Sequence, residues 1–287
     1  MQIVTDRAMD LSPQQLAGLK LHYASLGITL EGKTYKSGVD ISADEFYELI
    51  ANSDSYPTTS TPSSGEFADL YRSLAKDDPE ILSIHISSGL SGTYNAARLG
   101  AEQVPEAHVT LVDTLTLSCP MGWQVEAAAR AVNAGWPLER ILAKLQQIRE
   151  STEGLFTVAT MKYLIHGGRI SHIKGLVAAM LSIKPVIGVE KQHGTYVSLA
   201  QEITFKKAIH KMAERVTTWY PEGSKLRVQP LHGRNPEGAS IMMERMSQLF
   251  NLVTEPLTAI APVLGAHTGP GMVGMAVAPA ALFNDLP

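Results

Sequence analysis

The sequence predicts a two-domain α/β protein whose N-terminal sheet is mainly parallel and flanked by helices. Short apolar runs of strand length alternate with segments of helical length through the first half, which is typical of βαβ units. The 287 residues are 45% hydrophobic and 18% charged, a composition that supports a sizeable core. The pattern changes near residue 155. We therefore expect an N-terminal domain over residues 1–155 and a C-terminal α/β domain with a mixed sheet over 156–287.

The helix starts of the N-terminal half carry clear signals. Ser12, Ser42 and Ser63 each precede a Gln or Glu by three residues, which is the capping-box spacing. Pro57 and Pro62 keep the segment between them extended. We expect strands at residues 2–5, 28–30, 34–35, 81–86 and 109–113. Helices are expected at 13–24, 43–50 and 121–133. A further helix should begin after residue 63, another should follow the loop over 87–93 and continue to residue 102, and another should begin at residue 137.

The C-terminal half continues the alternation. Gly167 and Gly168 provide a C-cap for a short helix over 161–165. We expect strands at 155–159, 225–231, 253–257 and 261–264, and a hairpin formed by 184–190 and 196–200. Further helices are expected at 175–181, 205–219 and 235–250. A glycine-rich turn over 265–274 follows the last expected strand.

Charge, cysteine and histidine content exclude several classes of protein. The net charge of −4 gives no reason to expect a nucleic-acid partner. Cys119 is the single cysteine, which excludes an internal disulfide and a multi-thiolate zinc site. The histidines form no pair at metal-ligating spacing, so no metal is expected. The first residues lack a signal-peptide pattern and no apolar run could span a bilayer, so we expect a soluble cytoplasmic protein.

The loop over residues 87–93 is the first candidate site. It is built of Ser, Gly and Thr, with Leu90, and it joins a strand to a helix at the carboxyl end of the predicted sheet. Backbone N–H groups, hydroxyls and the helix dipole favour an anion there. No lysine follows Gly92, which excludes a Walker A loop, and G-x-G-x-x-G is absent. The nucleophile elbow G-x-S-x-G is one residue out of register, so Ser91 is a weak candidate nucleophile.

Three further side chains stand out. His267 lies in the glycine-rich segment, where a side chain can face a cleft, so both a functional and a structural role remain open. Arg169, after two glycines, can bind loop carbonyls, a negative ligand or a partner. His85 has apolar neighbours in a strand, and we expect it to be packed and hydrogen-bonded rather than a ligand.

Five segments, in this order and spacing, resemble the DegV family over essentially the whole chain. They are Thr59–Ser63, Ser87–Thr93, Gly167–Ser171, Lys184-Pro185 and His267–Gly271. The resemblance implies a two-domain α/β protein that binds one long-chain fatty acid and has no catalysis or cofactor of its own. Such proteins are similar to the binding subunit of bacterial fatty acid kinases, which presents the acyl carboxylate to a separate kinase subunit for conversion to an acyl phosphate.

The resemblance also implies the site residues. Those expected to bind the carboxylate are Thr59, Ser60, Ser91, Gly92, Thr93, His267 and Thr268, and Arg169 is expected to act in the kinase-dependent step or at the partner. The tail is expected to lie in a tunnel lined by Leu90, Ile170, Ile173, Leu176, Met180 and Met272. We expect a monomer when the chain is alone, with at most transient membrane contact.

Two alternatives from other classes remain open. One is an autonomous hydrolase or acyltransferase that uses Ser91 and His267. The other is a lipid carrier or sensor without a kinase partner. The chain also departs from the family pattern at Arg7, Cys119-Pro120 and Ile203. We expect the first two departures to reshape the tunnel and the third to affect partner recognition.

Overall fold

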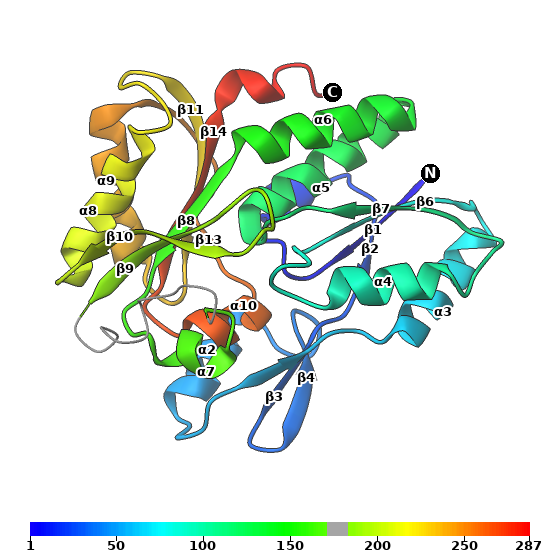
Figure 1. Ribbon diagram of the computed structural model, residues 1–287, viewed down its shortest axis with the longest axis horizontal. Helices are drawn as coiled ribbons and strands as arrows, with labels where there is room; N and C mark the ends of the chain where they lie inside the picture. The colour runs from blue at the N-terminus through cyan, green and yellow to red at the C-terminus, as the bar shows by residue number, and fades with distance from the viewer. Residues whose placement is uncertain (171–182) are drawn as a thin grey trace.

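The computed structural model describes residues 1–170 and 183–287, and its N-terminal half is built on a parallel sheet (Figure 1). The strand order is β2 (Leu21–Ala24), β1 (Gln2–Asp6), β6 (Glu80–His85) and β7 (His108–Asp113). Every neighbouring pair is parallel, as predicted. In such a sheet, loops that follow the strands gather at one edge, where ligands bind.

Helices cover both faces of this sheet. Side chains of α3 (Ser64–Ala75) and α4 (Thr93–Ala101) share a core with one face, while α5 (Ser118–Asn133) lies against β1 on the other side, with α6 (Leu138–Ser151) beside it. The predicted capping boxes are present at α1 (Pro13–Leu16), α2 (Ala43–Ala51) and α3. Each box satisfies backbone N–H groups that the first helical turn leaves free.

The helix expected over 13–24 is wrong. It ends after one turn, at Leu16, and residues 21–24 form β2 beside β1. Gly18 has a φ of +77°, which takes the chain out of the helix, and pairing with β1 then satisfies the backbone of residues 21–24. The strands expected at 28–30 and 34–35 are present as a hairpin of β3 (Gly27–Leu30) and β4 (Lys33–Lys36).

A third, short strand completes that small sheet. The proline-bounded segment contains β5 (Thr58–Ser60), which pairs antiparallel with β3 on the side opposite β4. Thr59 lies opposite Ile28, and Ile28 is 1% exposed, so β5 is anchored to the core at the position of its central residue. This pairing places the threonine-rich segment beside the C-terminal half of the chain (Figure 1).

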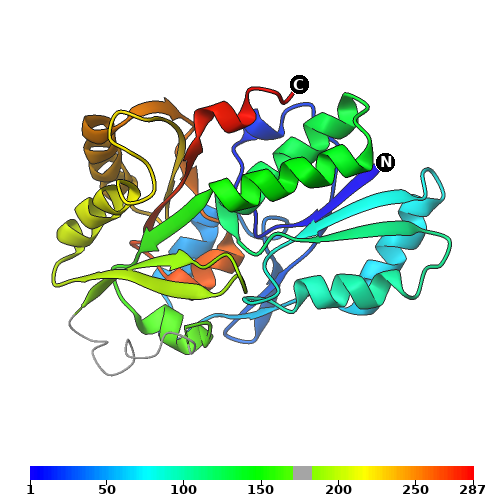
Figure 2. The ribbon, with the colours of Figure 1, turned by 45° about the horizontal axis from the view of Figure 1, so that its top comes forward.

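The C-terminal half is built on a mixed sheet, as expected. Its order is β10 (Tyr196–Glu202), β9 (Lys184–Val189), β8 (Glu153–Thr157), β14 (Val273–Pro279), β11 (Lys225–His232) and β12 (Asn251–Thr254), and β13 (Thr258–Ala259) also pairs with β11. The pairs are antiparallel except those of β11 with β12 and β13. The helices α8 (Phe205–Val216) and α9 (Pro236–Leu249) cover one face, and α5 and α6 lie on the opposite side (Figure 2).

The strand expected over 261–264 is wrong. These residues begin α10 (Pro262–Thr268), with Pro262 in its first turn. A short apolar run does not by itself distinguish a strand from a buried helix, and proline at the first helical position favours the helix. The sequence reading also missed β14, which occupies an interior position of the mixed sheet. The helix expected over 175–181 lies outside the described residues.

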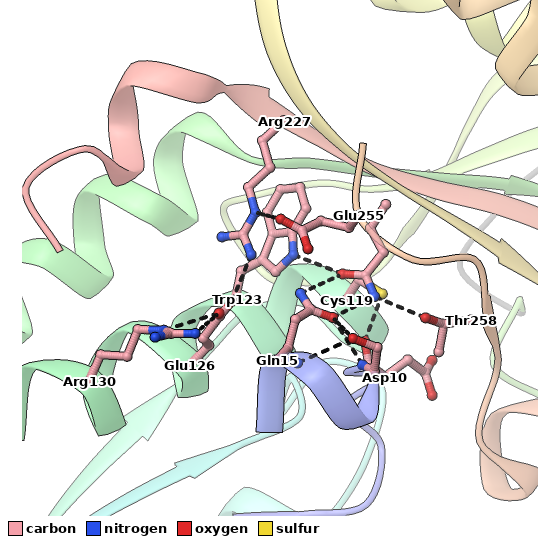
Figure 3. A network of polar contacts seen from close by, with 11 residues as sticks. Asp10, Gln15, Cys119, Trp123, Glu126, Arg130, Arg227, Glu255 and Thr258 are labelled. Carbon is pink, nitrogen blue, oxygen red and sulfur yellow. Dashed lines mark hydrogen bonds and ion pairs between the residues drawn. The ribbon is translucent and has the colours of Figure 1, made fainter. Parts of the chain in front are cut away.

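A buried polar network joins the two halves (Figure 3). The side-chain amides of Gln15 and Gln229 exchange hydrogen bonds of 3.0 and 3.1 Å, and the indole N–H of Trp123 donates to Gln229 at 2.9 Å. Arg227 pairs with Glu126 of α5 and with Glu255. Buried polar groups that are fully paired are costly to separate, so this network holds α1 and α5 against β11.

Within residues 1–170 and 183–287, no helix combines the length and the apolar character needed to cross a bilayer.

Candidate functional site

His267 and Thr59 form the centre of the candidate site. The Nε2 atom of His267 lies 3.0 Å from Oγ1 of Thr59, although the two residues are 208 positions apart in the chain. Thr59 is held by the pairing of β5 with β3, and His267 lies in the last turn of α10. The ring therefore belongs to a helix and not to a turn after a strand, contrary to the sequence reading.

The His267 imidazole is uncharged at neutral pH. Burial lowers its pKa to about 4, and the positive charges of Arg169 and His166 contribute to the same shift. Its Nδ1 atom is buried and has no hydrogen-bond partner within residues 1–170 and 183–287. A ring held in this state offers hydrogen-bonding capacity but no fixed charge.

The serine loop is positioned by its own hydrogen bonds. The backbone N–H groups of Leu90 and Ser91 donate to the carbonyl of Ser87, and Ser91 Oγ lies 2.8 Å from Oγ1 of Thr93. Thr93 is fully buried, and Gly92 is the exposed N-cap of α4. Of the predicted trio Ser91, Gly92 and Thr93, therefore, only Ser91 lines the pocket described next, and Thr93 contacts the Ser91 hydroxyl.

A cavity with both polar and apolar walls, here called the cradle pocket, brings most of the predicted polar residues together. Its lining residues surround about 490 Å³ of space, which includes solvent at the open side. Arg169 lines it as well, while its Nη1 donates to the carbonyl of Gly167 at 2.6 Å. The lining residues are Ala8, Leu26, Thr59, Ser60, Thr61, Ile86, Leu90, Ser91, Leu117, Arg169, Tyr196, Val263, Leu264 and His267.

A second cavity, the apolar pocket, adjoins the first. Its lining residues surround about 460 Å³ of space, open solvent included, and it shares the walls Leu117, Tyr196 and Leu264 with the cradle pocket. The remaining lining residues are Thr116, Ser118, Pro120, Gly154, Leu155, Phe156, Val189, Leu231, Ile260, Thr268, Met272 and Met275. A cavity that contains several hydroxyl groups, an arginine and a histidine, and that adjoins an almost wholly apolar one, suits a molecule with a charged head and an apolar tail.

The structure divides the remaining predicted residues. Thr268 and Met272 line the apolar pocket, so Thr268 does not belong to the cradle pocket. Ile170 is 3% exposed and packs in the core without lining either pocket. Ile173, Leu176 and Met180 lie outside the described residues.

Several lining residues were missed by sequence reasoning. Three residues line both cavities: Leu117, Tyr196 and Leu264. In the sequence each of them looks like an ordinary core residue. Of the departures from the family pattern, Pro120 lines the apolar pocket. Arg7 instead stacks over the ring of Tyr23, 4.3 Å from its centroid. Ile203 is 76% exposed, next to the end of β10.

A second polar cluster has the residue types of a catalytic triad but not its setting. His85 lies 3.0 Å from Asp6 and 2.7 Å from Ser83, whose hydroxyl lies 2.8 Å from that of Tyr71. All four side chains are fully buried, so no substrate can reach them. The prediction that His85 is packed and hydrogen-bonded is confirmed.

Among the residues that the structure describes, no group of three His, Cys, Asp or Glu side chains is arranged to hold a metal ion.

The fold and the paired cavities define a class: an α/β protein with an enclosed site suited to a small amphiphilic molecule. A family model described as an uncharacterised protein of the DegV family matches residues 1–280. The chain belongs to the DegV family. It is 34% identical over 279 residues to a DegV domain-containing protein of Deinococcus radiodurans, with 97% of this chain and 96% of that protein covered. A DegV domain-containing protein of Staphylococcus aureus is 34% identical over 275 residues, with 96% and 97% covered.

Solved structures share the whole fold. A DegV family protein of Thermus thermophilus, described in terms of fatty acid binding, superposes with a TM-score of 0.86 at 28% identity, covering 97% of this chain and 99% of its own. DegV of Bacillus subtilis, described as a fatty acid binding protein, superposes with a TM-score of 0.84 at 26% identity, covering 96% and 98%.

Proposed function

We propose that this chain binds one long-chain fatty acid, with the carboxylate in the cradle pocket and the tail in the apolar pocket. The observation that carries the proposal is the shared wall of Leu117, Tyr196 and Leu264 between a cavity with polar groups and a cavity lined almost entirely by apolar side chains. The description of similar structures as fatty acid binding proteins supports the same assignment.

The cradle pocket has the donors that a carboxylate needs. Thr59, Ser60 and Ser91 provide hydroxyl groups, His267 provides a ring nitrogen, and Arg169 provides the positive charge. Thr93 acts indirectly by positioning the Ser91 hydroxyl, and Gly92 caps the helix that follows. Because these hydrogen-bond donors lie in one pocket, they hold the carboxylate end of the acid there and so fix the direction in which the ligand binds.

The apolar pocket accounts for affinity. At about 0.8 kcal/mol per buried methylene, the tail of a sixteen-carbon acid contributes on the order of 10 kcal/mol before entropic costs. The head-group hydrogen bonds contribute roughly 1–3 kcal/mol each. The tail therefore sets how tightly the acid binds, and the cradle pocket sets which end faces outward.

We further propose that the chain is the substrate-presenting subunit of a fatty acid kinase system, acts in the cytoplasm, and performs no catalysis itself. Arg169, half-buried at the cradle pocket, is the residue assigned to the kinase-dependent step. An autonomous hydrolase is disfavoured because Ser91 bonds to Thr93 and His267 bonds to Thr59, so the described side chains do not form a serine–histidine pair. A histidine with a pKa of about 4 is also a weak general base near neutral pH.

Mass spectrometry of lipid extracted from natively purified protein tests ligand binding. We expect a long-chain fatty acid in the extract and binding of added palmitate or oleate after lipid removal. An empty extract together with no binding of either acid would contradict the proposal. A kinase assay with the partner subunit tests presentation: acyl phosphate is expected, whereas binding without acyl phosphate would identify a carrier or sensor instead.

A further inference from the structure

A third cavity lies against the apolar pocket, on walls other than those shared with the cradle pocket. Its lining residues surround about 290 Å³ of space, part of which is open solvent, and we call it the vestibule. Thr116, Pro120, Gly154 and Val189 line both it and the apolar pocket. The cradle pocket shares none of these four residues, so the vestibule adjoins a different part of the apolar pocket from the one next to the head-group site.

The remaining walls of the vestibule are polar. They are formed by Gln124, Arg149, Thr152 and Lys191, together with Leu115. An apolar chain that ended against these groups would desolvate them without replacing their hydrogen bonds, which is unfavourable. The polar walls of the vestibule therefore do not suit the terminal methyl group of a fatty-acid tail.

Thr152 carries an unused hydrogen-bonding group at this place. Its side chain is 6% exposed, and its Oγ1 has no hydrogen-bond partner within residues 1–170 and 183–287. Buried hydroxyl groups are almost always hydrogen-bonded, to protein or to another molecule. A ligand atom in the vestibule would provide the missing partner.

The charges of the vestibule favour an anion. Lys191 is paired with Glu153 and donates to the carbonyl of Glu150. Arg149, half-buried at the end of α6, forms no ion pair or side-chain hydrogen bond with any of the described residues. The charge of Lys191 is therefore neutralised by a carboxylate of the protein, whereas the charge of Arg149 is not.

We infer that the vestibule receives a carboxylate at the far end of the bound chain, so that the ligands of this protein include long-chain α,ω-dicarboxylic acids. The inference rests on the proposed function, because the tail must first occupy the apolar pocket. The second carboxylate accepts hydrogen bonds from Thr152 and Arg149, while the first occupies the cradle pocket.

Calorimetric titration of the lipid-free full-length protein tests this. Palmitate is compared with tetradecanedioic, hexadecanedioic and octadecanedioic acids, and the readout is the ratio of dissociation constants of diacid and palmitate. We expect the best diacid to bind within about tenfold of palmitate, whereas an unpaired buried carboxylate would weaken binding by more than about a thousandfold. Thr152→Val and Arg149→Gln should each raise the ratio at least about tenfold.

Arg140→Gln is the matched control, because Arg140 also lies on α6 but stacks on Trp136 instead of lining the vestibule. It should leave the ratio unchanged. Palmitate binding with every diacid more than about tenfold weaker would overturn the inference alone, and so would a ratio that Thr152→Val and Arg149→Gln do not change. Failure of palmitate itself to bind wild-type protein would overturn the proposed function, and this inference with it. 16-Hydroxyhexadecanoic acid binding better than every diacid would overturn the preference for an anion.

Discussion

The backbone at Gly167 lies directly against the imidazole of His267. A Cβ atom at position 167 would lie 2.2 Å from Nδ1 of that ring, far inside van der Waals contact. The hydrogen bond between Nε2 and Oγ1 of Thr59 forms on the other side of the ring. The end of α7 (Lys162–Gly167) thus fixes the ring by contact while β5 fixes it by a hydrogen bond.

This contact predicts that Gly167→Ala displaces the His267 ring and weakens palmitate binding by about tenfold or more, a loss of at least one hydrogen bond. The control is Gly168→Ala, where φ is +71° and a Cβ meets nothing within 4 Å. Backbone strain should lower the free energy of unfolding of that variant by about 1 kcal/mol and leave affinity unchanged. Equal affinities of the two variants would contradict the role of the contact.

Thr59→Val tests the head-group site with little change in shape. Loss of the hydroxyl should weaken palmitate binding by roughly tenfold, the equivalent of one hydrogen bond to a charged group. Thr58→Val on the same strand is the control, since Thr58 is exposed and lines neither pocket. Calorimetry on both lipid-free variants measures the difference, and matching affinities would remove Thr59 from the site.

Ser91→Ala tests whether the head-group site orients the fatty acid without setting how tightly it binds. We expect acyl phosphate formation with the kinase subunit to fall more than palmitate affinity does, because the tail supplies most of the binding energy. Ser88→Ala is the control, since Ser88 is an exposed residue of the same loop. A folded Ser91→Ala protein that loses all lipid would show that the head group controls affinity.

Binding should be coupled to proton uptake at His267. A carboxylate beside the ring raises the pKa of its imidazole from about 4 back toward 6.5, so binding takes up protons between these pH values and not at pH 8. Calorimetry in buffers of different ionisation enthalpy measures the uptake, and His267→Gln should abolish it. The same depressed pKa makes the free energy of unfolding of the lipid-free protein decrease as pH falls from 6.5 toward about 4.

Asp10 should produce the opposite pH dependence. Burial raises the pKa of its carboxyl from 3.8 to about 7, against the lowering effect of hydrogen bonds from Ser118 and the Ala261 backbone. The folded protein therefore binds this proton more tightly than the unfolded chain, and stability falls as pH rises through this interval. Asp10→Asn should raise the free energy of unfolding by on the order of 2–4 kcal/mol at pH 8 and by little at pH 4.

Urea denaturation at the two pH values measures this effect. Asp77→Asn serves as the control, because Asp77 is exposed and its carboxylate makes no hydrogen bond or ion pair with the described residues. A gain from Asp10→Asn that is the same at pH 4 and pH 8 would contradict the assignment to Asp10.

Local signals in the sequence predicted much of the fold. The capping boxes at Ser12, Ser42 and Ser63 are all formed, and β1, β6 and β7 of the first sheet lie where their apolar runs predicted. The errors at residues 21–24 and 261–264 share a cause. In both segments a short run is compatible with either structure, and the choice depends on pairing and burial against residues far along the chain.

The sequence by itself determined the α/β class, the serine loop as a candidate site and, through the resemblance, most of the polar residues that line the cradle pocket. Only the tertiary structure decided that Thr59, Ser91, Arg169 and His267 line one pocket, because pairing of β5 with β3 and packing of α10 bring them together. It also decided that Thr268 belongs to the apolar pocket and that polar walls adjoin that pocket elsewhere. Cavities arise between side chains of distant segments, and no local pattern encodes them.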